Sequence, residues 1–153
     1  MNVAGFRDAY TSAVPVEIAP ELVISVASIP GIAILKLFAW VDRGREDPKD
    51  AADLLMLFRQ YHEAGNQNRI YEDAIEALEA AGYDIELAGA WLLGNDVYAV
   101  SSSETRSQLA ALFTKHALVD RLVIDMSRAI RMRDDAVDNS RALLDQFIKG
   151  CDQ

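Results

Sequence analysis

Two different spacings of apolar residues divide the chain near residue 28. Before that point, apolar and other side chains alternate over residues 14–18, and a second β-rich run follows at 22–26. Alternation with a period of two is typical of strands, and the interruption at residues 19–21 predicts a β-hairpin or a small antiparallel sheet. Because proline has no N–H to donate, Pro15 should lie at a strand edge or at an unpaired position.

After residue 28 the apolar residues recur at helical spacing. Ser28 and Asp47 are suitable N-caps, and Pro30 and Pro48 follow them in the first turn, where a missing N–H is tolerated. These signals predict helices from 29 to 43 and from 48 to 61. Further helical stretches are expected at residues 70–81, 85–93, 102–113, 118–132 and 137–148.

Glycines and one capping pattern set the expected ends of these helices. Gly44, Gly82 and Gly94-Asn95 should stop helices, and Ser101 with Glu104 forms a capping box for the next one. No shift in composition marks an internal boundary. The sequence therefore predicts a single domain of the α+β class, predominantly helical. A β-rich segment over 1–28 leads into a bundle of about six helices over 29–153.

Composition indicates a folded, acidic protein. Of the 153 residues 51% are hydrophobic, which is enough for a core without disulfides or metals. The formal net charge of -9 disfavours a nucleic-acid partner, since such binding gains much of its energy from Lys and Arg on phosphates. Arginines at 121, 128, 131 and 133 could form a local basic patch, but nearby aspartates favour a solvated, mixed-charge helix face.

Few residues suggest metal binding or a membrane. Cys151 is the only cysteine, so no internal disulfide can form, and His62 and His116 have no companions at ligand spacing. The longest apolar run, 29–41, contains Lys36 and is too short to cross a bilayer. We therefore expect a cytoplasmic protein with no metal site of its own and no membrane partner.

Lys36 is the most informative residue, because an ammonium within the apolar run 32–40 needs a partner or a route to water. Arg43 follows two helical turns later on the same face. One interpretation is an amphipathic helix whose Lys36 reaches the surface along its apolar stem. The other is a cation that faces a cleft and binds a triphosphate.

A second charged group opens the following helix. Asp50 and Asp53 lie one turn apart, and Lys49 could pair with Asp53 at a spacing of four. The simple interpretation is a helix whose acidic first turn favours its dipole. The functional interpretation is that Asp50 or Asp53 holds Lys36 or Arg43 beside a ligand.

These segments together resemble one family. The likeness is carried by a β-rich segment, by Ser28-Ile29-Pro30-Gly31-Ile32, by the run from Leu35 to Arg43, and by Lys49-Asp50-Ala51-Ala52-Asp53-Leu54. Over roughly residues 3–100 the chain looks like the C-terminal portion of bacterial nucleotidyltransferase-like proteins of the AbiEii/AbiGii toxin type, which belong to the DNA polymerase β superfamily. The last third matches no family that we can name.

The resemblance implies a partial nucleotidyltransferase fold and a toxin–antitoxin context. Lys36 would match the family lysine that meets nucleotide phosphates, Arg43 the basic residue that closes its helix, and Lys49, Asp50 and Asp53 the motif that follows. A complete family member would use Mg²⁺ and an NTP, and would transfer NMP to a hydroxyl acceptor.

One departure from the family pattern matters. The family begins with a Gly-Gly or Gly-Ser helix start and an Asp-x-Asp strand that binds the divalent metals. The acids before Lys36 are only Asp8, Glu17 and Glu21, which are widely spaced. We therefore expect a chain that is inactive alone, paired with a missing N-terminal half or with a second copy through the exposed edge of the hairpin. The alternative is a non-catalytic, helical protein-interaction module.

Overall fold

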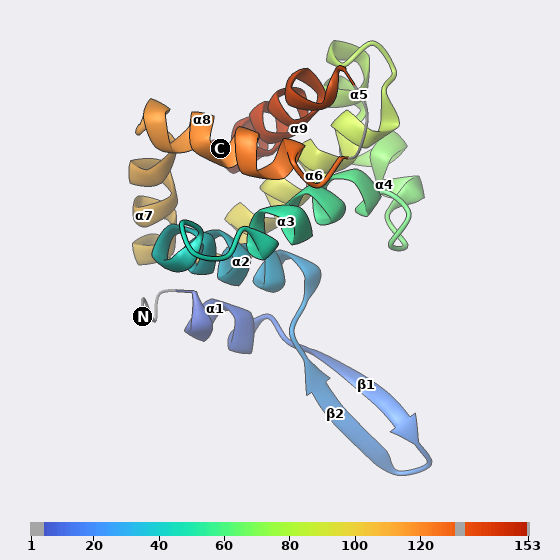
Figure 1. Cartoon of the computed structure of the whole chain (residues 1–153). Coiled ribbons are helices and arrows are strands. Elements are labelled where there is room, and N and C mark those ends of the chain that lie inside the picture. The colour runs from blue at the N-terminus through green and yellow to red at the C-terminus, as the bar shows by residue number, and fades with distance from the viewer. Residues whose placement is uncertain (1–4, 131–133, 153) are drawn as a thin grey trace.

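The computed structural model describes residues 5–130 and 134–152. A short helix, α1 (Phe6–Thr11), precedes an antiparallel hairpin of β1 (Val14–Ala19) and β2 (Leu22–Val26). Within the described ranges eight helices follow: α2 (Ile29–Arg43), α3 (Lys49–Gln60), α4 (Gln67–Glu72), α5 (Ile75–Ala80), α6 (Ile85–Val100), α7 (Ser103–Phe113), α8 (His116–Ser127) and α9 (Ala136–Cys151). The predominantly helical α+β class with an N-terminal hairpin is confirmed (Figure 1).

The hairpin projects away from the helices as a separate ribbon (Figure 1). Val14 pairs with Val26 and Val16 pairs with Ile24, so these four aliphatic side chains share one face, and Glu17 lies on the other. Every residue of both strands is exposed. Since an isolated two-stranded hairpin is only marginally stable in water, this ribbon lacks the packing that supports the rest of the chain.

Helix α1 has no counterpart in the sequence prediction. It packs against α2, and its buried Asp8 accepts hydrogen bonds from the backbone N–H and the hydroxyl of Ser102, at 3.1 and 3.2 Å. A six-residue helix is too short to be stable by itself. It depends on a partner 94 positions away, which local patterns do not show.

The start of α7 lies one residue later than predicted. Ser102 is the N-cap, and its hydroxyl accepts a hydrogen bond from the Thr105 N–H at 3.3 Å. The Ser101 hydroxyl is buried and instead donates to the carbonyl of Val97 at the end of α6. The predicted capping box at Ser101 and Glu104 is therefore wrong. Ser101 bonds to the end of α6, and Ser102 caps the start of α7.

Helix α6 crosses α9 with almost no side chain between them. A Cβ added to Gly94 would lie 2.1 Å from the carbonyl oxygen of Phe147, and one added to Gly150 would lie 2.1 Å from that of Trp91. Glycine is required at both positions because the two backbones touch. The predicted helix end at Leu93 is wrong, since Gly94 serves this close approach and α6 continues to Val100.

The core lies where α2, α3, α6, α8 and α9 meet. Phe58 of α3 stacks on Phe147 of α9 with ring centroids 4.7 Å apart, and Trp40 of α2 is fully buried. The helix predicted over 70–81 is instead split into α4 and α5, because Ala74 leaves the helical backbone region and buries its methyl group. This split and the extra α1 raise the helix number above the expected six in the described part of the chain.

Candidate functional site

The predicted cations lie on α2 and the predicted carboxylates lie on α3. The Ser28 hydroxyl caps α2 by accepting a hydrogen bond from the Gly31 N–H at 3.2 Å. Gly44 ends the helix against Trp40, whose indole lies where a Cβ would be. The short turn that follows brings the first turn of α3 alongside the second half of α2. The site is thus built from two helices that adjoin in sequence.

Asp50 is the centre of the cluster. Its carboxylate is only 2% exposed, and it accepts a hydrogen bond from the Lys36 ammonium at 3.0 Å. The Arg43 guanidinium donates two further bonds to it, from Nε at 2.8 Å and from a terminal nitrogen at 3.2 Å. A buried carboxylate thus orients two cations that reach toward water. The Lys36 side chain is 30% exposed and the Arg43 side chain 59%.

Asp53 completes the cluster from the solvent side. Its carboxylate is 44% exposed and lies 2.5 Å from the Lys36 ammonium. Lys36 therefore contacts two carboxylates, one buried in the protein and one partly exposed to water. Lys36, Arg43, Asp50 and Asp53 are brought together, and their role toward a ligand stays a prediction.

Lys49 lies apart from this cluster. Its side chain is 83% exposed, and its ammonium is 3.6 Å from the carboxylate of Asp47. The Asp47 carboxylate also accepts a hydrogen bond from the Lys49 backbone N–H at 3.0 Å, although the N-cap position of α3 is held by Pro48, one residue later than predicted. The pairing of Lys49 with Asp53 that the spacing allows is not the one observed: Asp53 contacts Lys36, and Lys49 contacts Asp47.

The pKa values follow these contacts. The hydrogen bond to Asp53, supported by Asp50, raises the pKa of Lys36 above its ordinary value. Burial acts to raise the pKa of Asp50, but the hydrogen bonds from Arg43 and Lys36 outweigh it, so that pKa lies below its ordinary value. Both groups are therefore charged across the neutral range.

The described residues do not fit a divalent metal. Among them, no group of three or more His, Cys, Asp or Glu side chains could hold a metal ion. Asp50 and Asp53, the carboxylates nearest the predicted phosphate position, already bind an ammonium and a guanidinium. Direct coordination of Mg²⁺ by these two carboxylates would compete with their three ion pairs to Lys36 and Arg43.

Behind the cluster, Trp40 connects α2 to α8. Its indole N–H donates to the buried carboxylate of Asp125 at 3.1 Å, and the Arg121 guanidinium lies 4.3 Å from its ring centroid. Arg128 pairs with the same Asp125 at 2.9 Å. Arg121 is thus used in packing, whereas the Arg128 side chain is 68% exposed and is paired with an aspartate. The other two arginines proposed for that patch, 131 and 133, lie outside the described residues.

Asp84, Glu86 and His62 take structural positions. Asp84 caps α6 by accepting a hydrogen bond from the Leu87 N–H at 3.1 Å, and Glu86 pairs with Arg59 of α3 at 3.0 Å. The side chain of His62 is only 13% exposed, and its Nδ1 has no hydrogen-bond partner.

A second charged cluster was missed by the sequence analysis. Arg69 of α4 makes a two-pronged contact with Asp96 of α6, at 2.7 and 2.8 Å, and a third contact with Asp73 at 2.9 Å. The Tyr61 hydroxyl donates to the same Asp96 at 2.5 Å. Arg69 and Asp96 are separated by 27 positions, and no local pattern in the sequence pairs them.

One comparison with known proteins gives a match. The sequence model of the family described as nucleotidyl transferase AbiEii toxin, type IV TA system, matches residues 4–148. Comparison with curated proteins and with solved structures gives no match. No helix in the described ranges is long and apolar enough to span a membrane.

The matched range corrects two expectations. It includes the hairpin and nearly all of the helical part, so the likeness does not end near residue 100 and is not only to a C-terminal portion of the family. The nucleotidyltransferase-like character and the toxin–antitoxin context are supported by this match. The chain therefore belongs to the AbiEii nucleotidyl transferase toxin family of type IV toxin–antitoxin systems.

Proposed function

We propose that the α2–α3 cluster binds the phosphate chain of a nucleoside triphosphate, in the setting of a transferase that moves NMP to a hydroxyl acceptor. The single observation that carries this proposal is the buried Asp50, which presents Lys36 and Arg43 side by side toward solvent. An ammonium and a guanidinium in this arrangement suit phosphate oxygens. Family membership supplies the reaction class.

The two cations of the cluster are balanced by its two carboxylates, so a phosphate can bind only if one carboxylate gives up its contact with a cation. Asp53 can do so, because its carboxylate is 44% exposed and is held by one contact to Lys36. A triphosphate can displace this carboxylate at little loss, since exposed ion pairs contribute only about 0 to 1 kcal/mol. Asp50 stays in place, because it is buried and holds both cations.

The proposed role is binding without turnover by this chain alone. Transfer of NMP forms a bond between the acceptor oxygen and the α-phosphorus and releases pyrophosphate, and the family performs this with metal-binding carboxylates. Asp50 and Asp53 are engaged with cations. We propose that carboxylates for catalysis come from outside residues 36–53, from a further polypeptide segment or from a partner.

A titration of the protein with inorganic triphosphate and with ATP tests the binding. Calorimetry should detect both ligands, and Lys36→Ala should weaken each by about tenfold, the value of one lost charge-assisted contact. Lys115→Ala is the matched control, because Lys115 is an exposed lysine at the start of α8, away from the cluster. No binding by the parent protein, or equal binding by Lys36→Ala, would refute the proposal.

Turnover is tested separately by pyrophosphate release. The protein with an NTP and Mg²⁺ should release no pyrophosphate above the Lys36→Ala background. Release that Lys36→Ala abolishes would contradict the proposal of inactivity alone while supporting the binding site.

A second candidate, a protein-interaction module, is favoured by the hairpin. The side chains of Val14, Val16, Ile24 and Val26 are 38 to 47% exposed on one uncharged face, and both strand edges are open. We propose a second copy of this chain as the occupant. Two such faces can pack together while Glu17, on the opposite face, stays in water.

Light scattering at micromolar concentration tests this candidate. The parent protein should be a dimer, Ile24→Lys should be a monomer, and Glu17→Lys, on the opposite face, should remain a dimer. A monomeric parent protein would remove the second-copy proposal. Dimers of Ile24→Lys would show that another surface holds the copies together.

A further inference from the structure

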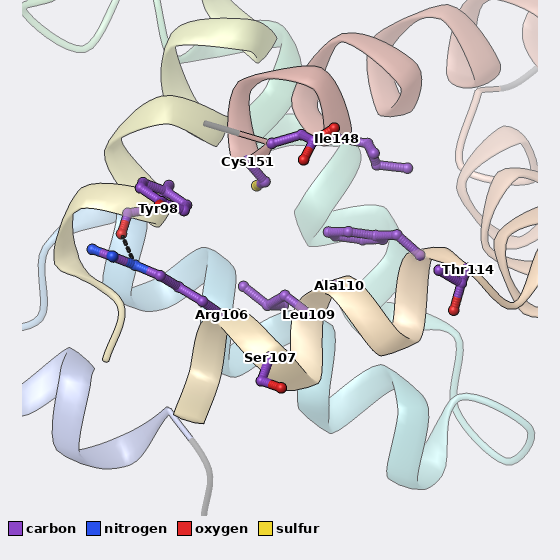
Figure 2. Close-up of a pocket in the computed structure, with 10 residues that line it drawn as sticks. Tyr98, Arg106, Ser107, Leu109, Ala110, Thr114, Ile148 and Cys151 are labelled. Atoms are coloured by element: carbon purple, nitrogen blue, oxygen red, sulfur yellow. Dashed lines mark hydrogen bonds between the residues drawn. The ribbon is translucent and has the colours of Figure 1, made fainter. Parts of the chain in front are cut away.

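A pocket of about 520 Å³ separates α7 from the ends of α6 and α9. Figure 2 shows Leu109 and Ala110 of α7 on one wall and Ile148 and Cys151 of α9 on the other, with Tyr98 and Arg106 at one end. Pockets that bind small molecules have volumes of about 300 to 1,000 Å³ and are mostly apolar. This pocket has a suitable size, and it lies on different helices from Lys36 and Asp50.

The interior of the pocket is mainly apolar. Leu109, Phe113 and Ile148 supply aliphatic and aromatic surface. Cys151 adds a thiol that donates to the Gly94 carbonyl at 3.4 Å, and burial raises the pKa of this thiol to about 12. The cysteine is therefore neutral at ordinary pH, and it extends the apolar wall without acting as a nucleophile.

Arg106 brings a preoriented cation to one end. Its Nε donates to the Tyr98 carbonyl at 3.0 Å, and its guanidinium carbon lies 3.9 Å from the centroid of the Tyr98 ring (Figure 2). These contacts fix the plane of the guanidinium and use only one of its nitrogens. No described carboxylate forms an ion pair with it. A fixed cation with donors to spare beside an apolar pocket suits an anionic group on an apolar body.

We propose that this pocket binds a small organic monocarboxylate with an apolar body. The carboxylate lies on the terminal nitrogens of Arg106, and the apolar body lies between α7 and α9 against Phe113 and Ile148. Asp152 also lines the pocket and repels a second negative charge, which favours a monoanion over a dianion. This inference concerns a second site and does not depend on nucleotide binding at Lys36.

Decanoate is the probe, and the rise in melting temperature with ligand concentration is the measurement. The parent protein should be stabilised by decanoate at millimolar concentration and much less by decanol, which lacks the charge. Arg106→Gln should require about tenfold more decanoate for the same shift, since it removes a charge-assisted contact. Asp152→Asn should require less decanoate than the parent, because a repelling charge is gone.

A variant with a blocked pocket provides the second test of this proposal. Ala110 is exposed at the mouth, so Ala110→Trp should fold and should block the stabilisation by decanoate. Lys36→Ala should respond to decanoate as the parent does. No stabilisation of the parent, or equal shifts in the parent and Ala110→Trp, would overturn the site. Equal shifts with decanoate and decanol, or an unchanged response in Arg106→Gln, would overturn the role of Arg106.

Discussion

The protein has two charged clusters that are built in opposite ways. In the α2–α3 cluster a buried carboxylate, Asp50, is the centre, and the cations Lys36 and Arg43 reach toward water. In the α4–α6 cluster a cation, Arg69, is the centre, and its main partner Asp96 is only 16% exposed. Both clusters connect helices, and the cations of both are partly exposed, Lys36 at 30% and Arg69 at 36%.

The difference distinguishes a cluster that can bind a ligand from one that only stabilises the fold. Arg69 has its nitrogens occupied by Asp96, Asp73 and Asn66, so little remains to bind a ligand. Lys36 has one exposed partner, Asp53, that can leave. The α4–α6 cluster should therefore govern stability, and the α2–α3 cluster should govern binding. Four variants, in order of expected effect, test this division.

Arg69→Ala should have the largest effect on stability. Removing one partner of a buried pair typically costs about 3 to 5 kcal/mol, and we expect about 2 to 3 kcal/mol because the Arg69 side chain is 36% exposed. Urea unfolding measures this loss. Arg141→Ala is the matched control, since Arg141 is also 36% exposed but pairs with Asp120, which is 65% exposed. Equal losses of stability in the two variants would contradict a stabilising role for the α4–α6 cluster.

Asp50→Asn should cost less, about 1 to 2 kcal/mol, because Lys36 and Arg43 can turn into water when their anchor is lost. The pKa of Asp50 is lowered in the folded state, so its stabilisation is present above the ordinary carboxyl pKa and is lost as pH falls through the lower, folded value. The difference from the parent in urea unfolding should therefore persist at pH 7, begin to shrink below about pH 4, and disappear only below the lower, folded pKa.

Triphosphate binding sharpens the Asp50 prediction. The same variant should bind inorganic triphosphate more weakly, since the two cations are no longer oriented. Unchanged binding with reduced stability would show that Asp50 is only a structural contact between α2 and α3.

Tyr61→Phe should cost about 1 kcal/mol, the value of one hydrogen bond. The Tyr61 hydroxyl donates to Asp96, and burial with the neighbouring Asp96 raises the pKa of Tyr61 well above its ordinary value. Tyr61 therefore stays protonated, and the loss in urea unfolding should be the same at pH 6 and pH 9. A loss that grows or fades over this interval would contradict that protonation state.

Asp53→Asn should have the smallest effect on stability, within about 0.5 kcal/mol, because Asp53 is 44% exposed. Its effect on binding should be opposite to that of Asp50→Asn. Without the competing carboxylate, inorganic triphosphate should bind more tightly in calorimetry. Weaker binding by Asp53→Asn would mean that Asp53 helps to position Lys36 for the ligand.

The sequence predicted those features that are formed by residues close together along the chain. The cap at Ser28 and the hairpin at 14–26 follow from residues within a few positions of each other. The contact between Lys36 and Asp50 was also predictable, because they lie on consecutive helices joined by a short turn. Here the sequence analysis needed no knowledge of the overall packing.

Other features depend on contacts between distant segments. Gly94 has the sequence signature of a helix end, and only the backbone of α9 against it explains why α6 continues. In the same way α1 depends on Ser102, and Arg69 is paired through α6. In each case the deciding partner is more than 25 positions away, beyond the reach of periodicity and capping rules.

The contact of Gly94 with Gly150 has a consequence for how the protein opens. Two backbones that touch without intervening side chains leave no room for water, so their amide protons can exchange with solvent only when the helices separate. The hairpin amides lie in a ribbon exposed on both faces and need no such event. Deuterium should therefore enter β1 and β2 first and the middle of α6 last.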